Sequence, residues 1–177
     1  MAKPRLDDPL TAEQLRAILD YNGETGIFVW RRRADYRREW NARYVGEPAG
    51  TVMGAYRLIS IKKRRYVASR LAWLWVYGKW PSDFVDHANG NKRDDRISNL
   101  RAATKSQNSA NIGAPVHNTS GLKGVSWDKR SGKWRAQICY QNKRRGLGLF
   151  NTASEAHKAY CDEAVRLHGD FAKLGDA

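Results

Sequence analysis

Hydrophobic and polar residues follow both helical and strand-like spacings along the chain, and this mixture predicts an α+β protein. Apolar residues repeat at helical spacing over residues 10–21, where Thr11 is a suitable N-cap, so a short helix is expected there. Residues 27–30 and 56–61 have the pattern of strands. The basic, aromatic stretch 31–43 shows no clear period and is predicted to be a loop.

The middle of the chain predicts a helix followed by a hairpin. Residues 70–77 are apolar nearly all round, which indicates a buried helix that ends at Gly78. Residues 84–87 and 100–103 predict two short strands around a loop rich in Asn, Gly and Asp. A capping box that opens at Thr104 then predicts a helix. The order is therefore strand, loop, strand, helix.

The last third of the chain has a different pattern. A capping box at Thr152 predicts one helix, closed by Gly169. Before it come three strand-like segments, at residues 124–127, 133–140 and 144–150. We expect two domains, residues 1–112 and 120–177, joined by a linker over 113–119 that is rich in turn-forming residues.

The charge of the chain indicates a polyanionic partner. There are 32 Lys and Arg residues against 18 Asp and Glu, a formal net charge of +14, and the excess is shared by both predicted domains. Interleaved Trp and Tyr favour nucleic acid over the alternative of a merely soluble basic protein. The most apolar run, residues 71–77, is too short to span a membrane, so no membrane partner is expected.

Cysteine usage and the N-terminal residues point to an intracellular protein. Cys139 and Cys161 form no CxxC pair and offer neither a zinc site nor a disulfide framework. No apolar signal segment is visible near residue 1, so we expect an intracellular protein that is not secreted.

The predicted hairpin carries the side chains that best support chemistry. Asp86 and His87 end its first strand, and Asn99 and Asn108 follow later in the motif. A helix packed back on the hairpin would bring Asn108 to face Asp86. Carboxylate and amide oxygens are hard ligands suited to Mg²⁺ or Mn²⁺, and a neutral imidazole accepts a proton near neutral pH. Taken singly, an Asp-His pair is most often structural, and asparagines are most often caps or turn formers.

These residues and three further motifs resemble the HNH homing-type endonucleases of phages and mobile introns. The matching segments are residues 21–30, 70–74, 85–91 and 96–101. The resemblance implies a ββα-metal fold, with its core motif at residues 84–112, and cleavage of duplex DNA that leaves 3′-hydroxyl and 5′-phosphate ends.

The same resemblance assigns roles to four residues. It implies that one Mg²⁺ or Mn²⁺ ion is held by Asp86 and Asn108, that His87 is the general base, and that Asn99 orients His87 and braces the hairpin. Ser69 departs from the family pattern, which commonly has a histidine at that position. This departure leaves open whether activity is weakened.

Residues 118–174 resemble the APETALA/ethylene-response-factor type of DNA-binding domain. The matching segments are 120–127, 133–138, 147–152 and 155–160. The resemblance implies a three-stranded antiparallel sheet packed on one helix. The face of the sheet that the helix leaves free would enter the major groove. The residues expected to bind DNA are Lys123, Ser126, Trp127, Lys129, Arg135, Gln137 and Arg144. Trp134 fits a core position equally well.

Together these features predict a monomeric, metal-dependent endonuclease that nicks or cuts double-stranded DNA at a preferred site. The alternative is a non-catalytic, sequence-specific DNA-binding regulator built from the same two modules. An RNA-binding protein has less support, because no stacking motif of an RNA module is present.

Overall fold

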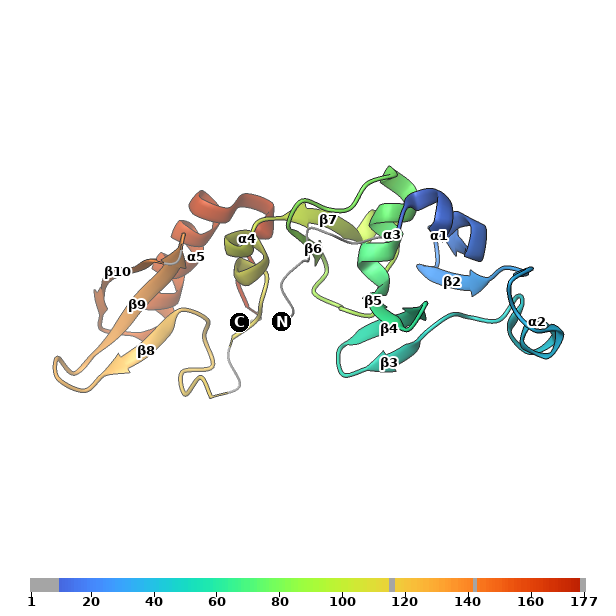
Figure 1. Cartoon of the computed structure of the whole chain (residues 1–177). Helices are drawn as coiled ribbons and strands as arrows, with labels where there is room; N and C mark the ends of the chain where they lie inside the picture. Colours follow the sequence, from blue (N-terminus) through green and yellow to red (C-terminus); the bar gives the residue numbers. More distant parts are fainter. Residues whose placement is uncertain (1–9, 115–116, 142, 176–177) are drawn as a thin grey trace. The chain divides into compact units, whose positions relative to one another are not determined.

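The computed structural model describes residues 10–114, 117–141 and 143–175, and it divides the chain into two compact units (Figure 1). Unit 1 is Met1–Ala102 and unit 2 is Ala103–Ala177. Both contain helices and sheets, which confirms the mixed α and β class. The predicted linker at 113–119 lies inside unit 2, so the predicted domain limits stay a prediction.

Unit 1 begins with a helix and a hairpin. Helix α1 spans Ala12–Ile18, and Thr11 is its N-cap, as predicted. The Thr11 side chain accepts a hydrogen bond from the backbone of Gln14 in a capping box. The helix is shorter than expected, because β1 (Leu19–Asn22) pairs antiparallel with β2 (Ile27–Trp30). Burial alternates along β1, so strand pairing overrides the helical spacing that continues past Ile18.

The basic stretch after β2 was predicted to be a loop, but it contains helix α2 (Arg38–Tyr44). None of its residues is buried, which explains why the sequence shows no helical hydrophobic period there. Aromatic rings hold it instead, since Trp40 contacts the rings of Trp30, Tyr36 and Tyr44.

A three-stranded antiparallel sheet and a helix complete the core of unit 1. The strands are β3 (Thr51–Met53), β4 (Tyr56–Ile61) and β5 (Arg64–Val67), in that order, and α3 (Ala68–Tyr77) follows. Gly78 ends α3 in the left-handed conformation, with φ of 72°. The largest fully buried side chains come from all these elements except β3, α2 and β5: Leu15, Leu19, Phe28, Ile59, Ile61, Leu71 and Leu74.

Helix α3 is buried over its first turns, as predicted, but its last turn is not. Val76 and Tyr77 are 37% and 49% exposed. Apolar composition alone does not show which turns of a helix the core covers.

The predicted hairpin is present at the end of unit 1. Strand β6 (Phe84–His87) and strand β7 (Leu100–Ala103) form a two-stranded sheet, with a 3₁₀ turn at Ile97–Asn99 before β7. The loop between them is therefore bounded by two paired strands, which restrict where its polar side chains lie.

Unit 2 contains α4 (Lys105–Ala110), which starts at the predicted Thr104 capping box, and a sheet with one long helix. The sheet has the order β10-β9-β8 and is antiparallel throughout. Its strands are β8 (Val125–Asp128), β9 (Lys133–Tyr140) and β10 (Lys143–Phe150).

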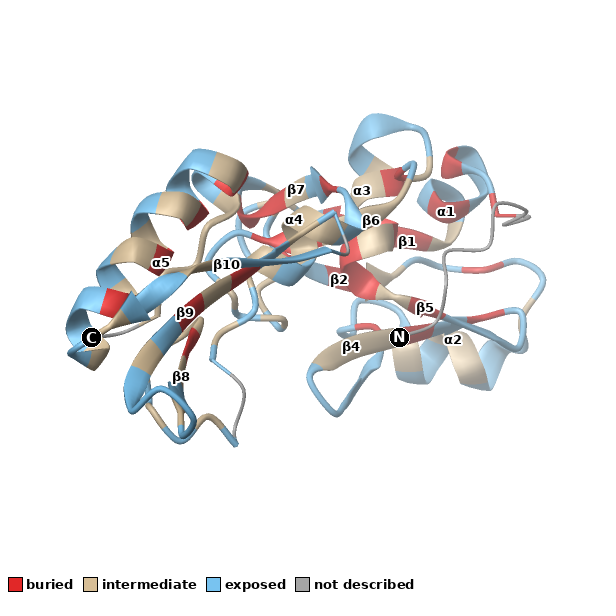
Figure 2. Cartoon of the chain, turned by 90° about the vertical axis from the view of Figure 1, so that its left-hand side faces the viewer, coloured by how far each residue is buried: buried red, intermediate tan, exposed pale blue. Residues whose placement is uncertain are grey.

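Helix α5 (Ala153–His168) packs on one face of this sheet, and a 3₁₀ turn at Gly169–Phe171 follows it. Figure 2 shows the buried residues along the middle of β9 and on α5. Ala136, Ile138, Ala156 and Tyr160 are among them. Over the described parts of both units, no helix is both long and apolar enough to cross a membrane.

Candidate active site and DNA-binding surface

The end of β6 places two ionisable side chains in a protected position. Asp86 is 5% exposed and His87 is 4% exposed. Charged or titratable groups are rarely this buried unless they are paired or serve a function. The loop and strand that follow provide their partners.

The loop after His87 is braced by Asn99. The Asn99 side chain accepts from the Asn89 backbone N–H at 3.0 Å and donates to the Asp94 carbonyl at 2.8 Å. Asp94 also accepts from Arg96 and from the Asn89 side chain, and the Arg96 guanidinium is the main reason why the pKa of Asp94 falls to about 2. These contacts give the polar loop one defined conformation.

His87 is held by a residue that the sequence did not single out. Its Nε2 lies 3.0 Å from Oδ1 of Asp95, which is only 2% exposed. Tyr21 donates its hydroxyl to the Asp95 carbonyl at 2.6 Å, and burial and the Asp95 charge raise the pKa of that tyrosine. No local pattern marks Asp95 as different from Asp94, because its partners lie on β1 and β6.

Asp86 is paired with a cation in this structure. Nε of Arg101, on β7, lies 3.0 Å from Oδ2 of Asp86, and Nη2 lies 2.9 Å from the same oxygen. The pair offsets the cost of a buried carboxylate. An oxygen donor of this kind suits a hard divalent cation, so the chemistry of the site fits Mg²⁺ or Mn²⁺.

The second predicted metal ligand, Asn108, lies on α4 in unit 2, whereas Asp86, His87 and Asn99 all lie in unit 1. Within the described residues, no three His, Cys, Asp or Glu side chains gather closely enough to hold a metal ion. An asparagine amide and a single carboxylate do not form such a group, so the predicted ligand pair remains a proposal.

The neighbourhood of His87 also contains an aromatic side chain. The ring of Tyr56, on β4, is centred 6.4 Å from that of His87, and the Lys92 ammonium lies 5.4 Å from the Tyr56 ring centre. Ser69, at the position of the expected family histidine, is 2% exposed in the first turn of α3.

In unit 2, strand alternation decides which predicted DNA-binding residues share a face. Ala136 and Ile138 of β9 are buried on the side of α5, so Arg135 and Gln137 lie on the opposite face. Cross-strand partners share a face, which adds Ser126, paired with Arg135, and Arg144, paired with Cys139.

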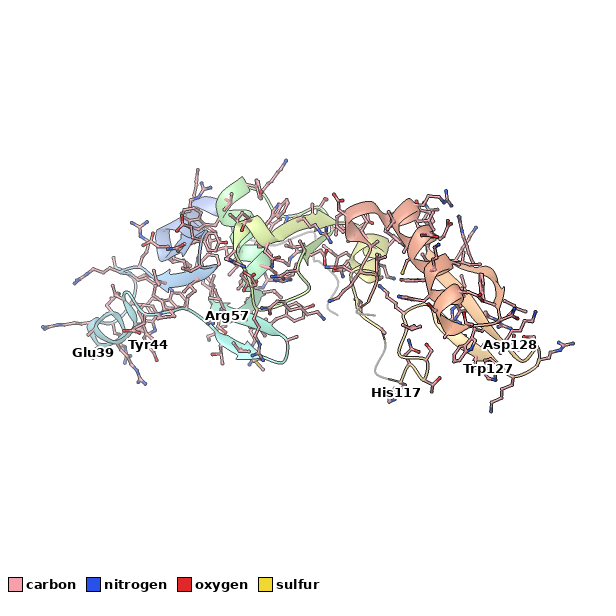
Figure 3. All side chains as sticks on the ribbon, turned by 180° about the vertical axis from the view of Figure 1, so that it is seen from behind. Glu39, Tyr44, Arg57, His117, Trp127 and Asp128 are labelled. Carbon is pink, nitrogen blue, oxygen red and sulfur yellow. The ribbon has the colours of Figure 1, made fainter. Side chains whose placement is uncertain are left out.

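One of the predicted DNA contacts, Trp127, lies on the other face. Trp127 pairs with Trp134 on the helix side of the sheet, with ring centres 5.0 Å apart, so it is not on the open face although it is 47% exposed. Trp134 packs in the core cluster. Figure 3 labels Trp127 beside Asp128 at the end of β8, and Asp128 forms an ion pair with Arg135.

Lys123 is occupied within unit 2. Its ammonium donates to the Ala110 carbonyl at 2.6 Å and to the Lys173 carbonyl at 2.9 Å, and burial lowers the pKa of Lys123 to about 8. An ammonium used in this way does not fit a phosphate contact. Lys129 is exposed in the turn after β8. Gln137, Arg144 and Lys123 also line a cavity of about 420 Å³.

Comparison with known proteins identifies the region around this hairpin. A family model described as HNH endonuclease matches residues 66–110. The chain is 32% identical over 124 residues to Protein 3.8 of Escherichia phage T7, which covers 68% of this chain and 97% of that protein. It is 30% identical over 130 residues to Uncharacterized HNH endonuclease L560 of Acanthamoeba polyphaga mimivirus, which covers 73% of this chain and 64% of the relative. No solved structure gives a significant match.

Proposed function

Residues 66–110 match the HNH endonuclease family, and from this premise we propose that the chain is a metal-dependent endonuclease that nicks duplex DNA at preferred sites. The observation that carries the proposal is the buried Asp86–His87 pair at the end of β6, inside the matched region, with a carboxylate holding His87. A single such motif per chain supports a nick rather than a double-strand break.

His87 acts as the general base in this proposal. Hydrolysis of a phosphodiester needs a water molecule aligned with the leaving oxygen and a group that takes its proton. A neutral imidazole does this near neutral pH, and burial keeps His87 in one orientation. Asn99 supports the site by bracing the loop that follows His87.

Asp86 would bind the divalent ion, Mg²⁺ or Mn²⁺. When bound, the ion supplies positive charge for the phosphate oxygens in the transition state. Arg101 neutralises Asp86 in the structure described here, so its guanidinium must share or release that carboxylate. A phosphate group is a suitable alternative partner for a guanidinium released near the site.

Residues 120–177 supply DNA binding in this proposal, through the sheet face opposite α5. Ser126, Arg135, Gln137 and Arg144 share that face, and Lys129 lies in the adjoining turn. Arginine and glutamine side chains recognise guanine and adenine edges in the major groove. Linking this module to the nuclease raises local DNA concentration without new contacts.

A plasmid-cleavage assay tests the proposal. Supercoiled DNA is incubated with the wild-type chain in Mg²⁺, Mn²⁺ or EDTA, beside His87→Ala and a matched control, His117→Ala, which changes an exposed histidine. We expect metal-dependent conversion to the relaxed circle by the wild type and by His117→Ala. His87→Ala should bind DNA but leave the plasmid supercoiled.

The other outcomes separate the competing functions. Salt-sensitive DNA binding with no cutting in either metal would favour the regulator. Equal cutting by His87→Ala would remove His87 from the chemistry. Accumulation of linear DNA without a relaxed intermediate would show paired cleavage of both strands.

A further inference from the structure

Asp95 is placed beside His87 by contacts from several separate elements. Tyr21 on β1 donates to its carbonyl, and Asn99 donates to the carbonyl of the residue before it. Gly26 lies directly against it, because a Cβ there would come within 2.6 Å of the Asp95 carbonyl carbon. These contacts fix the backbone at Asp95, so its carboxylate meets His87 as part of the fold.

The position of the Asp95 carboxylate is unfavourable for stability alone. Its Oδ2 is buried and accepts no hydrogen bond from the described residues. A buried acceptor without a partner normally destabilises a protein, and such groups in native structures call for an explanation. A role in positioning the imidazole provides one.

We propose that Asp95 is the positioning residue that fixes the orientation and tautomer of His87. The family resemblance instead assigns the orientation of His87 to Asn99. The inference rests on the proposed function of His87. An ionised carboxylate only accepts hydrogen bonds, so the proton of the neutral imidazole sits on Nε2, which is 3.0 Å from Asp95. The lone pair that accepts a proton from water is then on Nδ1. Asn99 braces the loop that carries Asp95.

NMR of the imidazole nitrogens tests the tautomer without any cleavage. The His87 signals are assigned by their loss in His87→Ala, at a pH where the ring is neutral. We expect the Nε2–H form in the wild type and a mixture of tautomers in Asp95→Ala. An unchanged tautomer in Asp95→Ala would overturn the proposal, whether or not the chain proves to be a nuclease.

Single-turnover cleavage then tests the positioning role. Asp95→Ala should lower the rate at saturating enzyme by roughly 10–100-fold, as loss of an outer-shell partner commonly does, with DNA affinity unchanged within twofold. Asp20→Ala is the matched control, since Asp20 is exposed and pairs with Arg31 outside the loop that carries Asp95. Equal loss in both variants, or loss of DNA affinity with an unchanged rate, would indicate only a structural role for Asp95.

A second inference concerns α2, which lies outside the region matched by the family model. Residues 31–43 contain six arginines and two acidic residues. Arg33 is 4% exposed, stacks 3.6 Å from the Tyr36 ring centre and pairs with Asp35. The remaining arginines are exposed.

Side-chain hydrogen bonds and ring contacts hold this segment, because the apolar core does not cover it. The Asn41 side chain accepts from the Arg33 backbone N–H at 2.9 Å and donates to the Arg33 carbonyl at 2.8 Å. Trp40 packs against three rings on α2 and its neighbours. Arg32, Arg37 and Arg38 pair with no carboxylate within the described part of the chain, so the scaffold presents uncompensated positive charge.

We infer that Arg32, Arg37 and Arg38 bind backbone phosphates of duplex DNA outside the cut site. This rests on the proposed DNA substrate. Within unit 1, α2 lies at the end far from the β6–β7 hairpin (Figure 1). Figure 3 labels two residues of α2, Glu39 and Tyr44. Guanidinium groups suit phosphate oxygens, and a rigid support lowers the entropy lost on binding.

The salt dependence of binding tests this surface in EDTA, where no cleavage is needed. The triple variant Arg32→Ala, Arg37→Ala, Arg38→Ala should reduce the slope of log K against log salt by roughly 2–3, at about 0.9 per phosphate contact. Lys62→Ala, Lys63→Ala, Lys79→Ala removes the same charge from exposed positions in unit 1. An equal change in this control would show that only net charge matters.

Two further measurements separate a defined contact from general attraction. Asn41→Ala removes no charge but releases the support of α2, and it should weaken binding by about threefold or more. The effect of the arginine variant should vanish on a duplex truncated on the α2 side of the cut site. An unchanged slope on long DNA, or the same loss on truncated DNA from either side, would overturn the inference.

Discussion

Replacement of Asn99 by Ala tests how far the loop after β6 determines catalysis. The side chain is 8% exposed and joins two points of the loop, the Asn89 N–H and the Asp94 carbonyl. Alanine removes both hydrogen bonds and adds no new group. The loop carries Asp95, so its displacement should also release His87.

The magnitude follows from these two contacts. Each contributes about 0.5–1.5 kcal/mol, so the free energy of unfolding should fall by about 1–3 kcal/mol. Asn99→Asp is the informative comparison, because its carboxylate still accepts from the Asn89 N–H but faces the Asp94 carbonyl. We expect it to destabilise the chain as well, by repulsion and loss of one donor.

Urea unfolding measures the loss of stability, and single-turnover nicking of supercoiled plasmid measures the loss of cleavage rate. In Asn99→Ala the cleavage rate should fall at least tenfold, measured without urea at a temperature where the chain remains folded. Stability lowered as expected, together with a wild-type cleavage rate, would refute the reasoning that the braced loop holds His87. A lower rate without any loss of stability would instead mean that Asn99 acts directly on the reaction.

Three further predictions concern both units. Gly124→Ala should lower the free energy of unfolding by about 2–5 kcal/mol, because φ is +78° and a Cβ would lie 2.0 Å from the Tyr160 ring. Gly132→Ala is the control: φ is +62° but a Cβ would meet no other atom, so the free energy of unfolding should fall by only about 1–2 kcal/mol. Similar losses in urea unfolding would contradict the steric argument. Lys123 has its pKa lowered from 10.5 to about 8, so the unfolded chain binds more protons between these values and stability should rise with pH across that window. Lys123→Met should lack this rise, and parallel pH profiles of unfolding would reject the assignment. Asp86→Ala should weaken Mn²⁺ binding about tenfold or more by calorimetry, and an unchanged titration would remove Asp86 from the metal site.

Local patterns were sufficient for much of the fold. The capping boxes at Thr11, Thr104 and Thr152 all form, because each depends on residues only three positions apart. Strand β9 has the predicted bounds for a similar reason: its alternation reflects one covered face and one open face. The Asp86–His87 pair was identified by its motif and lies at the end of a strand, as expected.

The predictions that failed depend on contacts between distant segments. The spacing after Ile18 suits a helix, but pairing with β2 makes β1 a strand. Helix α2 buries no residue, so it leaves no hydrophobic period to detect. Distant pairing also sets the face of Trp127, whose part in DNA binding stays a prediction. Its register places it opposite Trp134 on the helix side of the sheet, and a one-residue shift would reverse that face.

The sequence by itself determined the class of protein, the hairpin and the residue types that suit phosphodiester chemistry, because these follow from local spacing and composition. Only the tertiary structure decided which groups touch His87 and Asp86. Tyr21 and Asp95 are 74 residues apart, and Arg101 reaches Asp86 across the hairpin. Such partners are chosen by chain packing and by the requirement that buried polar groups be paired, and neither is visible in the order of residues along one segment.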